Sequence, residues 1–86
     1  MIRNLKIGGV YTHYKSEEMK YMVIAEAINS ETLEKLVIYQ SLYDHGKYKK
    51  GTVWARPKEM FLEELPKETQ KKYDKKYRFC ALEEKE

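Results

Sequence analysis

The chain has 86 residues, of which 42% are hydrophobic and 36% charged, with a formal net charge of +3. This length predicts a single small domain near the lower limit for a self-sufficient core, which we place at about residues 8–82, before an acidic tail at 83–86. No apolar run approaches the roughly 20 residues of a membrane span, the first residues lack the features of a signal peptide, and one cysteine excludes an internal disulfide. We therefore expect a cytoplasmic domain with no membrane partner.

Aromatic and β-branched residues gather in short runs, a pattern that favours strands. They predict five strands, over residues 10–15, 20–29, 34–43, 52–56 and 77–82, with a polar turn at 16–18. The nearly continuous apolar run at 20–29 indicates burial on both faces, although a helix is the alternative because Ala, Glu and Met are good helix formers. The expected fold class is mainly β, either a small SH3-like barrel or a strongly bent antiparallel sheet of about five strands with one or two short helical turns.

Two prolines predict where the helical turns begin. Pro57 ends the fourth strand because it has no N–H to donate, and it suits the first position of a helix that would turn Met60 and Phe61 into the core. Pro66 would start a second short helix through Tyr73, with a mobile loop as the alternative. Six Lys or Arg residues lie between positions 67 and 78, and we interpret them as a solvated charged face.

The first and third predicted strands carry candidate binding residues. Because side chains alternate along a strand, Tyr11, His13 and Lys15 share one face and form a row that could bind an anion. The alternative for His13 is a hydrogen-bonded structural residue. Tyr39 and Tyr43 would add to an aromatic surface, or would lie at the edge of the core with satisfied hydroxyls.

The stretch at 52–61 carries the second candidate site. If Val53 and Ala55 point inward, Trp54 and Arg56 lie side by side on an accessible face. An aromatic plane beside a cation is a suitable seat for a stacked, anionic ligand. The alternative is that Trp54 faces the core and Arg56 makes a structural ion pair.

Several linked motifs follow one another in a fixed order along the chain. They are Gly-Val-Tyr-Thr-His-Tyr-Lys at 9–15, Ser-Glu-Thr-Leu-Glu at 30–34, Val-Ile-Tyr-Gln-Ser-Leu-Tyr at 37–43, Trp-Ala-Arg-Pro at 54–57 and Arg-Phe at 78–79. This order resembles the small bacterial family catalogued as domain of unknown function 1653, over roughly residues 8–82. The segments at 44–51 and 65–77 are longer than the family pattern. The resemblance implies a small, mostly β domain whose recurrent polar positions map onto Tyr11, His13, Lys15, Tyr39, Trp54, Arg56 and Arg78.

The residue inventory favours a binding module over an enzyme. No nucleophile has an evident base beside it, and His13, His45 and Cys80 lack the spacing of a metal site, so we expect no catalytic residue, metal or cofactor, although a carboxylate-based hydrolase remains open. Gly46 and Gly51 have phosphate-loop spacing, but a threonine follows where a lysine is required.

The leading hypothesis is a non-catalytic domain that binds a nucleotide or single-stranded nucleic acid. Lys15, Arg56 and Arg78 would contact phosphate, while Trp54 or a tyrosine would stack on a base. The alternative is a protein-interaction or homodimer module that uses a sheet edge and exposed tyrosines.

Overall fold

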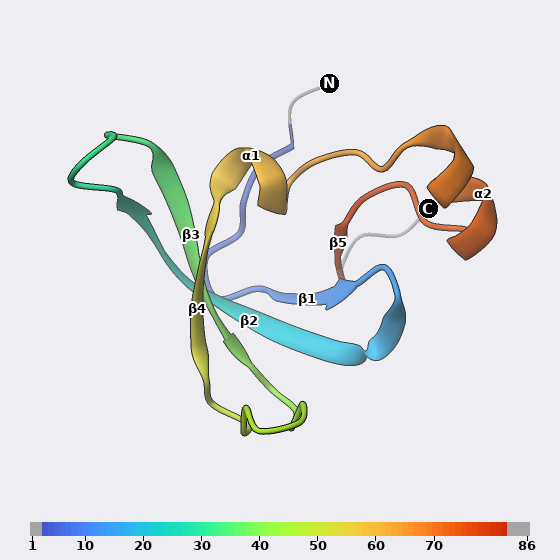
Figure 1. The fold of residues 1–86 in the computed structure, drawn as a ribbon, viewed down its shortest axis with the longest axis horizontal. Coiled ribbons are helices and arrows are strands. Elements are labelled where there is room, and N and C mark those ends of the chain that lie inside the picture. Colours follow the sequence, from blue (N-terminus) through green and yellow to red (C-terminus); the bar gives the residue numbers. More distant parts are fainter. Residues whose placement is uncertain (1–2, 83–86) are drawn as a thin grey trace.

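The computed structural model describes residues 3–82, so the predicted acidic tail lies outside the described residues. Five antiparallel strands form one strongly bent sheet with the order β4-β3-β2-β1-β5 (Figure 1). The strands are β1 (Val10–His13), β2 (Ser16–Ile28), β3 (Lys35–Ser41), β4 (Val53–Pro57) and β5 (Phe79–Ala81). This architecture confirms the predicted fold class, including a strand rather than a helix at 20–28.

Two short helices, α1 (Lys58–Phe61) and α2 (Lys67–Tyr73), lie between β4 and β5 in the sequence. Both start where the prolines predict, and the mobile-loop alternative for 67–73 is wrong. Pro57 and Pro66 each occupy the N-cap rather than the first helical position, because their ψ angles of 137° and 152° are extended. In Figure 1, α1 lies against the bend of the sheet, whereas α2 lies beyond the end of the β1–β2 hairpin. Neither helix in residues 3–82 is long and apolar enough to cross a membrane.

The connection between β1 and β2 is tighter than predicted. His13 pairs with Ser16, so the chain reverses through the two residues Tyr14 and Lys15, and the predicted turn at 16–18 is wrong. The polar residues that suggested a turn instead form the exposed start of β2, where the Ser16 hydroxyl accepts a hydrogen bond from the Glu18 N–H.

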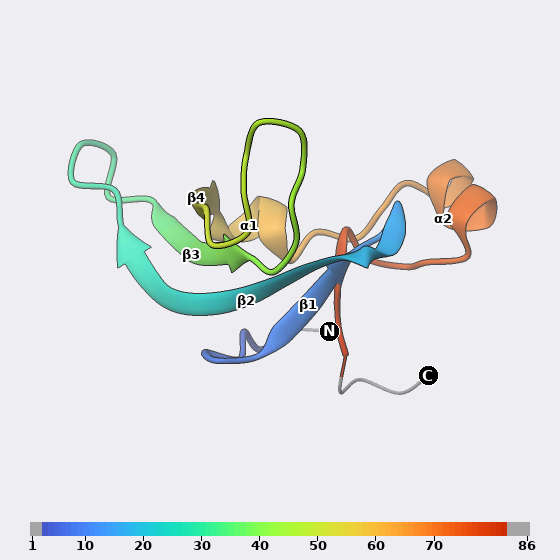
Figure 2. The same ribbon diagram turned by 90° about the horizontal axis from the view of Figure 1, so that it is seen from below.

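A β-bulge in β2 changes which side chains share a face. Val23 pairs with Tyr39 but Ala25 pairs with Ile38, which leaves Ile24 as the extra residue. Beyond the bulge, Glu26 pairs with Val37 and therefore lies on the same face as Val23. Such a bulge also bends its strand, and Figure 2 shows the curvature of β2.

The core lies on one side of the bent sheet, which we call the inner face. Its buried side chains come from four strands and from α1, namely Tyr11, Val23, Val37, Tyr39, Phe61 and Phe79. Phe61 reaches the core from α1 and stacks on Phe79 at a centroid distance of 4.3 Å and an interplanar angle of 5°. The helix thus closes an aromatic core, and the polar ends of neighbouring side chains lie at the margin of that core.

Candidate functional site

Arg56 lies on the inner face of β4, opposite Val37. Its Nε donates a hydrogen bond to the Tyr39 hydroxyl at 3.1 Å, and its guanidinium carbon is 5.3 Å from the centre of the Phe79 ring. Among residues 3–82, Arg56 makes no ion pair with a carboxylate. Arg56 is therefore oriented by aromatic groups, while no carboxylate in the described part of the chain pairs with its charge.

His13 lies beside this arginine in a neutral state. Burial, followed by the charges of Lys15, Arg56 and Arg78, lowers the pKa of His13 from 6.5 to about 4. Its Nδ1 accepts a hydrogen bond from the Lys15 backbone N–H at 3.2 Å, so the proton of the neutral ring is on Nε2. His13 is therefore neutral mainly because it is partly buried, with the three nearby cations adding to the effect, and it offers one neutral N–H donor.

Arg78, the residue just before β5, completes the group. Its Nη2 pairs with the Glu63 carboxylate at 2.7 Å, which holds the guanidinium in place. Its Nε is buried with no hydrogen-bond partner among the described residues. An unpaired buried donor is costly and uncommon in folded proteins, and it marks this position as one that packing alone does not explain. We refer to His13, Arg56 and Arg78 as the arginine cluster.

Tyrosine hydroxyls border the cluster. The hydroxyls of Tyr21 and Tyr43 lie 2.6 Å apart, and the ring of Tyr21 packs edge-on against Tyr39 at 5.3 Å. Burial, together with the hydrogen bond to Tyr43, raises the pKa of Tyr21, and the charge of Arg56 opposes this rise. The margin of the aromatic core therefore presents hydroxyl groups as well as guanidinium groups.

Trp54 lies next to Arg56 along β4, and of the two orientations that the sequence left open, the one with Val53 and Ala55 pointing inward is not adopted. Val53 is 58% exposed and Ala55 is also exposed, so both point outward. Trp54 pairs with Tyr39 across the sheet and is half-buried on the inner face, where its Nε1 donates to the Ser41 hydroxyl at 2.8 Å. The alternative orientation correctly placed Trp54 against the core. The ion pair that this alternative assigned to Arg56 is not formed within residues 3–82.

Tyr11 and Lys15 are predicted site residues that are not members of the arginine cluster. Tyr11 is only 1% exposed, and its hydroxyl accepts a hydrogen bond from the Lys6 N–H at 3.0 Å, so it belongs to the core. Lys15 is exposed in the β1–β2 turn, near enough to lower the pKa of His13. The structure thus gathers the arginine cluster at Tyr39 and Phe79, with Trp54 beside it and Lys15 at its margin.

The sequence analysis missed three contributors to the site: Phe79, Tyr21 and Glu63. Their roles depend on contacts between elements that are distant in the sequence, such as the ion pair from Glu63 to Arg78. The Arg-Phe motif at 78–79 was a partial signal for Phe79. Within residues 3–82, no group of three or more His, Cys, Asp and Glu side chains is arranged to hold a metal ion.

Comparison with known proteins identifies the family of this chain. The model of the family described as protein of unknown function DUF1653 matches residues 9–81. The chain belongs to this family. The matched DUF1653 region includes all five strands and every member of the arginine cluster. No curated protein and no solved structure matches the chain.

Proposed function

We propose that this DUF1653 domain is a non-catalytic binding module whose inner face holds an anionic, nucleotide-type ligand. The observation that carries the proposal is Arg56, which is oriented by Tyr39 and Phe79 and has no carboxylate partner among residues 3–82. A planar guanidinium held in advance suits phosphate because it can donate two parallel hydrogen bonds without first losing side-chain freedom.

The neighbouring groups supply the rest of such a site. Arg78 adds a second guanidinium, and the neutral His13 adds an N–H donor that does not need to be protonated. Trp54, with Tyr48 edge-on at 5.0 Å, offers an aromatic surface two residues from Arg56 along the same face of β4. Stacking on a planar base and contacts to its phosphate are the two interactions that nucleotide recognition combines.

The strand order supports the finer description of the fold as a small SH3-like barrel, with α1 between the fourth and fifth strands. Modules of this kind bind ligands on a sheet face or between loops. A cytoplasmic location is proposed on the same footing, because a chain with one cysteine cannot form an internal disulfide.

The test uses Trp54 as the reporter, since it is the only tryptophan in the chain. Purified protein would be screened against nucleoside phosphates, cyclic dinucleotides and inorganic phosphate, by Trp54 fluorescence and by thermal shift, at low and moderate salt. A ligand that binds only the folded state raises the melting temperature, by an amount that corresponds to about 2.7 kcal/mol at a concentration of 100 times its Kd.

Two variants make the screen specific. Arg56→Gln should abolish the response, whereas Lys35→Gln removes one exposed charge at the start of β3 and should preserve it. Equal responses from both variants, or no response across the panel with folded protein, would refute the proposal.

A protein-interaction module is the second candidate, and the edge of the sheet favours it. β4 is an edge strand, and Val53 on it is 58% exposed. Exposed edges pair readily with another chain. If the domain forms a homodimer through this edge, Val53→Lys should shift its mass to that of a monomer in light scattering, while Arg56→Gln should not.

A further inference from the structure

A series of aromatic rings continues from the arginine cluster to α2. The His13 ring lies 4.6 Å from Tyr14, and Tyr14 lies 5.0 Å from Tyr73, the last residue of α2. Tyr14 and Tyr73 are both half-buried, so part of each ring is accessible. The turn after β1 and the end of α2, nearly sixty residues apart in the sequence, thus present neighbouring rings.

Lysines accompany these rings. The Lys15 Nζ lies 5.9 Å from the centre of the Tyr14 ring, and the Lys72 Nζ lies 5.5 Å from the centre of the Tyr73 ring. Both lysines are exposed. We call the surface formed by His13, Tyr14, Lys15, Lys72 and Tyr73 the aromatic track. Cations therefore lie beside the rings along its length, from the arginine cluster outward.

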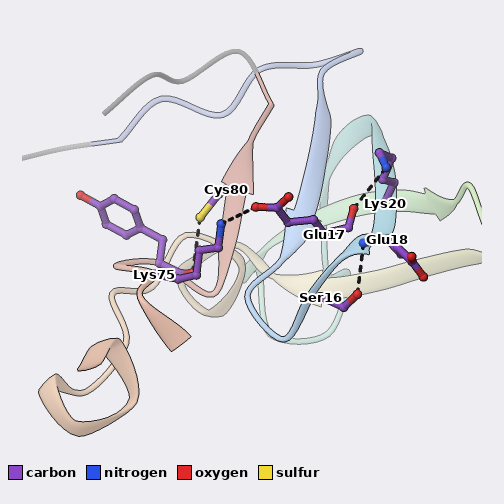
Figure 3. A network of polar contacts seen from close by, with 7 residues as sticks. Ser16, Glu17, Glu18, Lys20, Lys75 and Cys80 are labelled. Atoms are coloured by element: carbon purple, nitrogen blue, oxygen red, sulfur yellow. Dashed lines mark hydrogen bonds and ion pairs between the residues drawn. The ribbon is translucent and has the colours of Figure 1, made fainter. Parts of the chain in front are cut away.

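Contacts next to the track hold its two halves together. Lys75, just after α2, pairs with Glu17 of β2 at 2.9 Å, as Figure 3 shows. The Tyr14 N–H also donates to the Arg78 carbonyl at 2.9 Å, which connects the β1–β2 turn to the segment between α2 and β5. The Lys75 ion pair uses the nearby Glu17 carboxylate, so this acid is engaged beside the track rather than opposing an anion on it.

We propose that the ligand of the inner face is a single-stranded nucleic acid, which runs from the arginine cluster along the aromatic track to Tyr73. This inference rests on the proposed function and deepens it. A mononucleotide would occupy only the arginine cluster, whereas a single strand would also cover the aromatic track. Rings interleaved with cations are the arrangement that binds single strands, through base stacking and phosphate contacts. Small sheet modules typically stack about two or three bases, which suits the two rings added beyond His13.

The experiment compares ligand lengths in the full chain. Labelled oligothymidylates and oligouridylates of two, four and eight nucleotides would be titrated by fluorescence anisotropy, beside a mononucleotide. The octamer should bind at least about tenfold more tightly than the dimer, because each additional stacked base contributes on this order.

Variants test whether the higher affinity for the octamer comes from the aromatic track. Tyr73→Ala should lower octamer affinity about tenfold and leave the mononucleotide response unchanged. Lys72→Gln should reduce the slope of log K against log salt by about 0.7, the loss of one phosphate contact, whereas Lys67→Gln at the opposite end of α2 should not. If Tyr73→Ala is unstable, Lys72→Glu provides the same test by charge reversal.

The outcomes separate the two proposals. A mononucleotide response that requires Arg56, with no gain in affinity from dimer to octamer, would overturn the track and leave the proposed function intact. No binding of any nucleotide or oligonucleotide would overturn both. Binding of polyglutamate as tight as that of the octamer, and unaffected by Tyr73→Ala, would overturn the track in favour of an acidic protein partner.

Discussion

Acidification should destabilise the domain through His13. Its pKa is lowered from 6.5 to about 4 in the folded state, so between these values the unfolded chain binds more protons than the folded protein. The contribution of His13 to the free energy of unfolding is therefore fully present above pH 6.5, and it is lost as the pH falls toward 4. Because one unit of pKa shift corresponds to about 1.36 kcal/mol, the whole difference between the folded and unfolded pKa of His13 corresponds to about 3 kcal/mol. Because His13 is only half-buried, solvent screens the surrounding charges, and we expect about 1–2 kcal/mol.

Urea unfolding at pH 7 and at pH 4, followed by Trp54 fluorescence, measures this loss. Carboxylates also contribute to acid denaturation, so the informative quantity is the difference between wild type and His13→Gln. Wild type should lose about 1–2 kcal/mol more than the variant on acidification. His45→Gln, which alters an exposed histidine in the 44–50 loop, should behave as wild type. An equal loss in His13→Gln and wild type would refute the lowered pKa of His13 that its burial and the neighbouring cations produce.

Two further predictions concern the aromatic core and the tyrosine pair. Phe61→Ala removes the ring that α1 stacks on the core and should cost about 3–5 kcal/mol in urea unfolding, whereas Met60→Ala, at a position 43% exposed on the same helix, should cost far less; comparable losses would contradict the role given to α1. In a spectrophotometric titration, Tyr21 should ionise above the ordinary range, and Tyr43→Phe should lower its pKa only in part because burial is the larger cause; a complete return to the ordinary value would contradict this order.

Alternation along strands explains what the sequence could predict. It placed Tyr11 with His13 and Trp54 with Arg56 on common faces, because side chains two apart in a strand point the same way. The prolines at 57 and 66 marked both helix starts, since proline ends a strand and tolerates a helix N-terminus. These signals are local in the sequence, and they were sufficient to predict the five strands and the two short helices.

The remaining features depend on pairing between strands or on distant contacts. The bulge at Ile24, which moves Glu26 to the inner face, follows from the register of β2 against β3 and has no local signature in an apolar run. The sequence left the orientation of Trp54 open for a similar reason, because alternation defines two faces of a strand without indicating which one is buried. The contact of Tyr14 with Tyr73 depends on how α2 folds back toward the β1–β2 turn.

The pKa of His13, measured by NMR with and without ligand, tests the central claim most directly. An anion bound at the arginine cluster would supply the opposite charge that His13 lacks, so its pKa should rise from about 4 on addition of a nucleotide at millimolar concentration. The rise should disappear in Arg56→Gln and persist in Lys35→Gln. A His13 pKa that stays the same with every nucleotide and short oligonucleotide tested would contradict the claim that the inner face binds an anionic ligand.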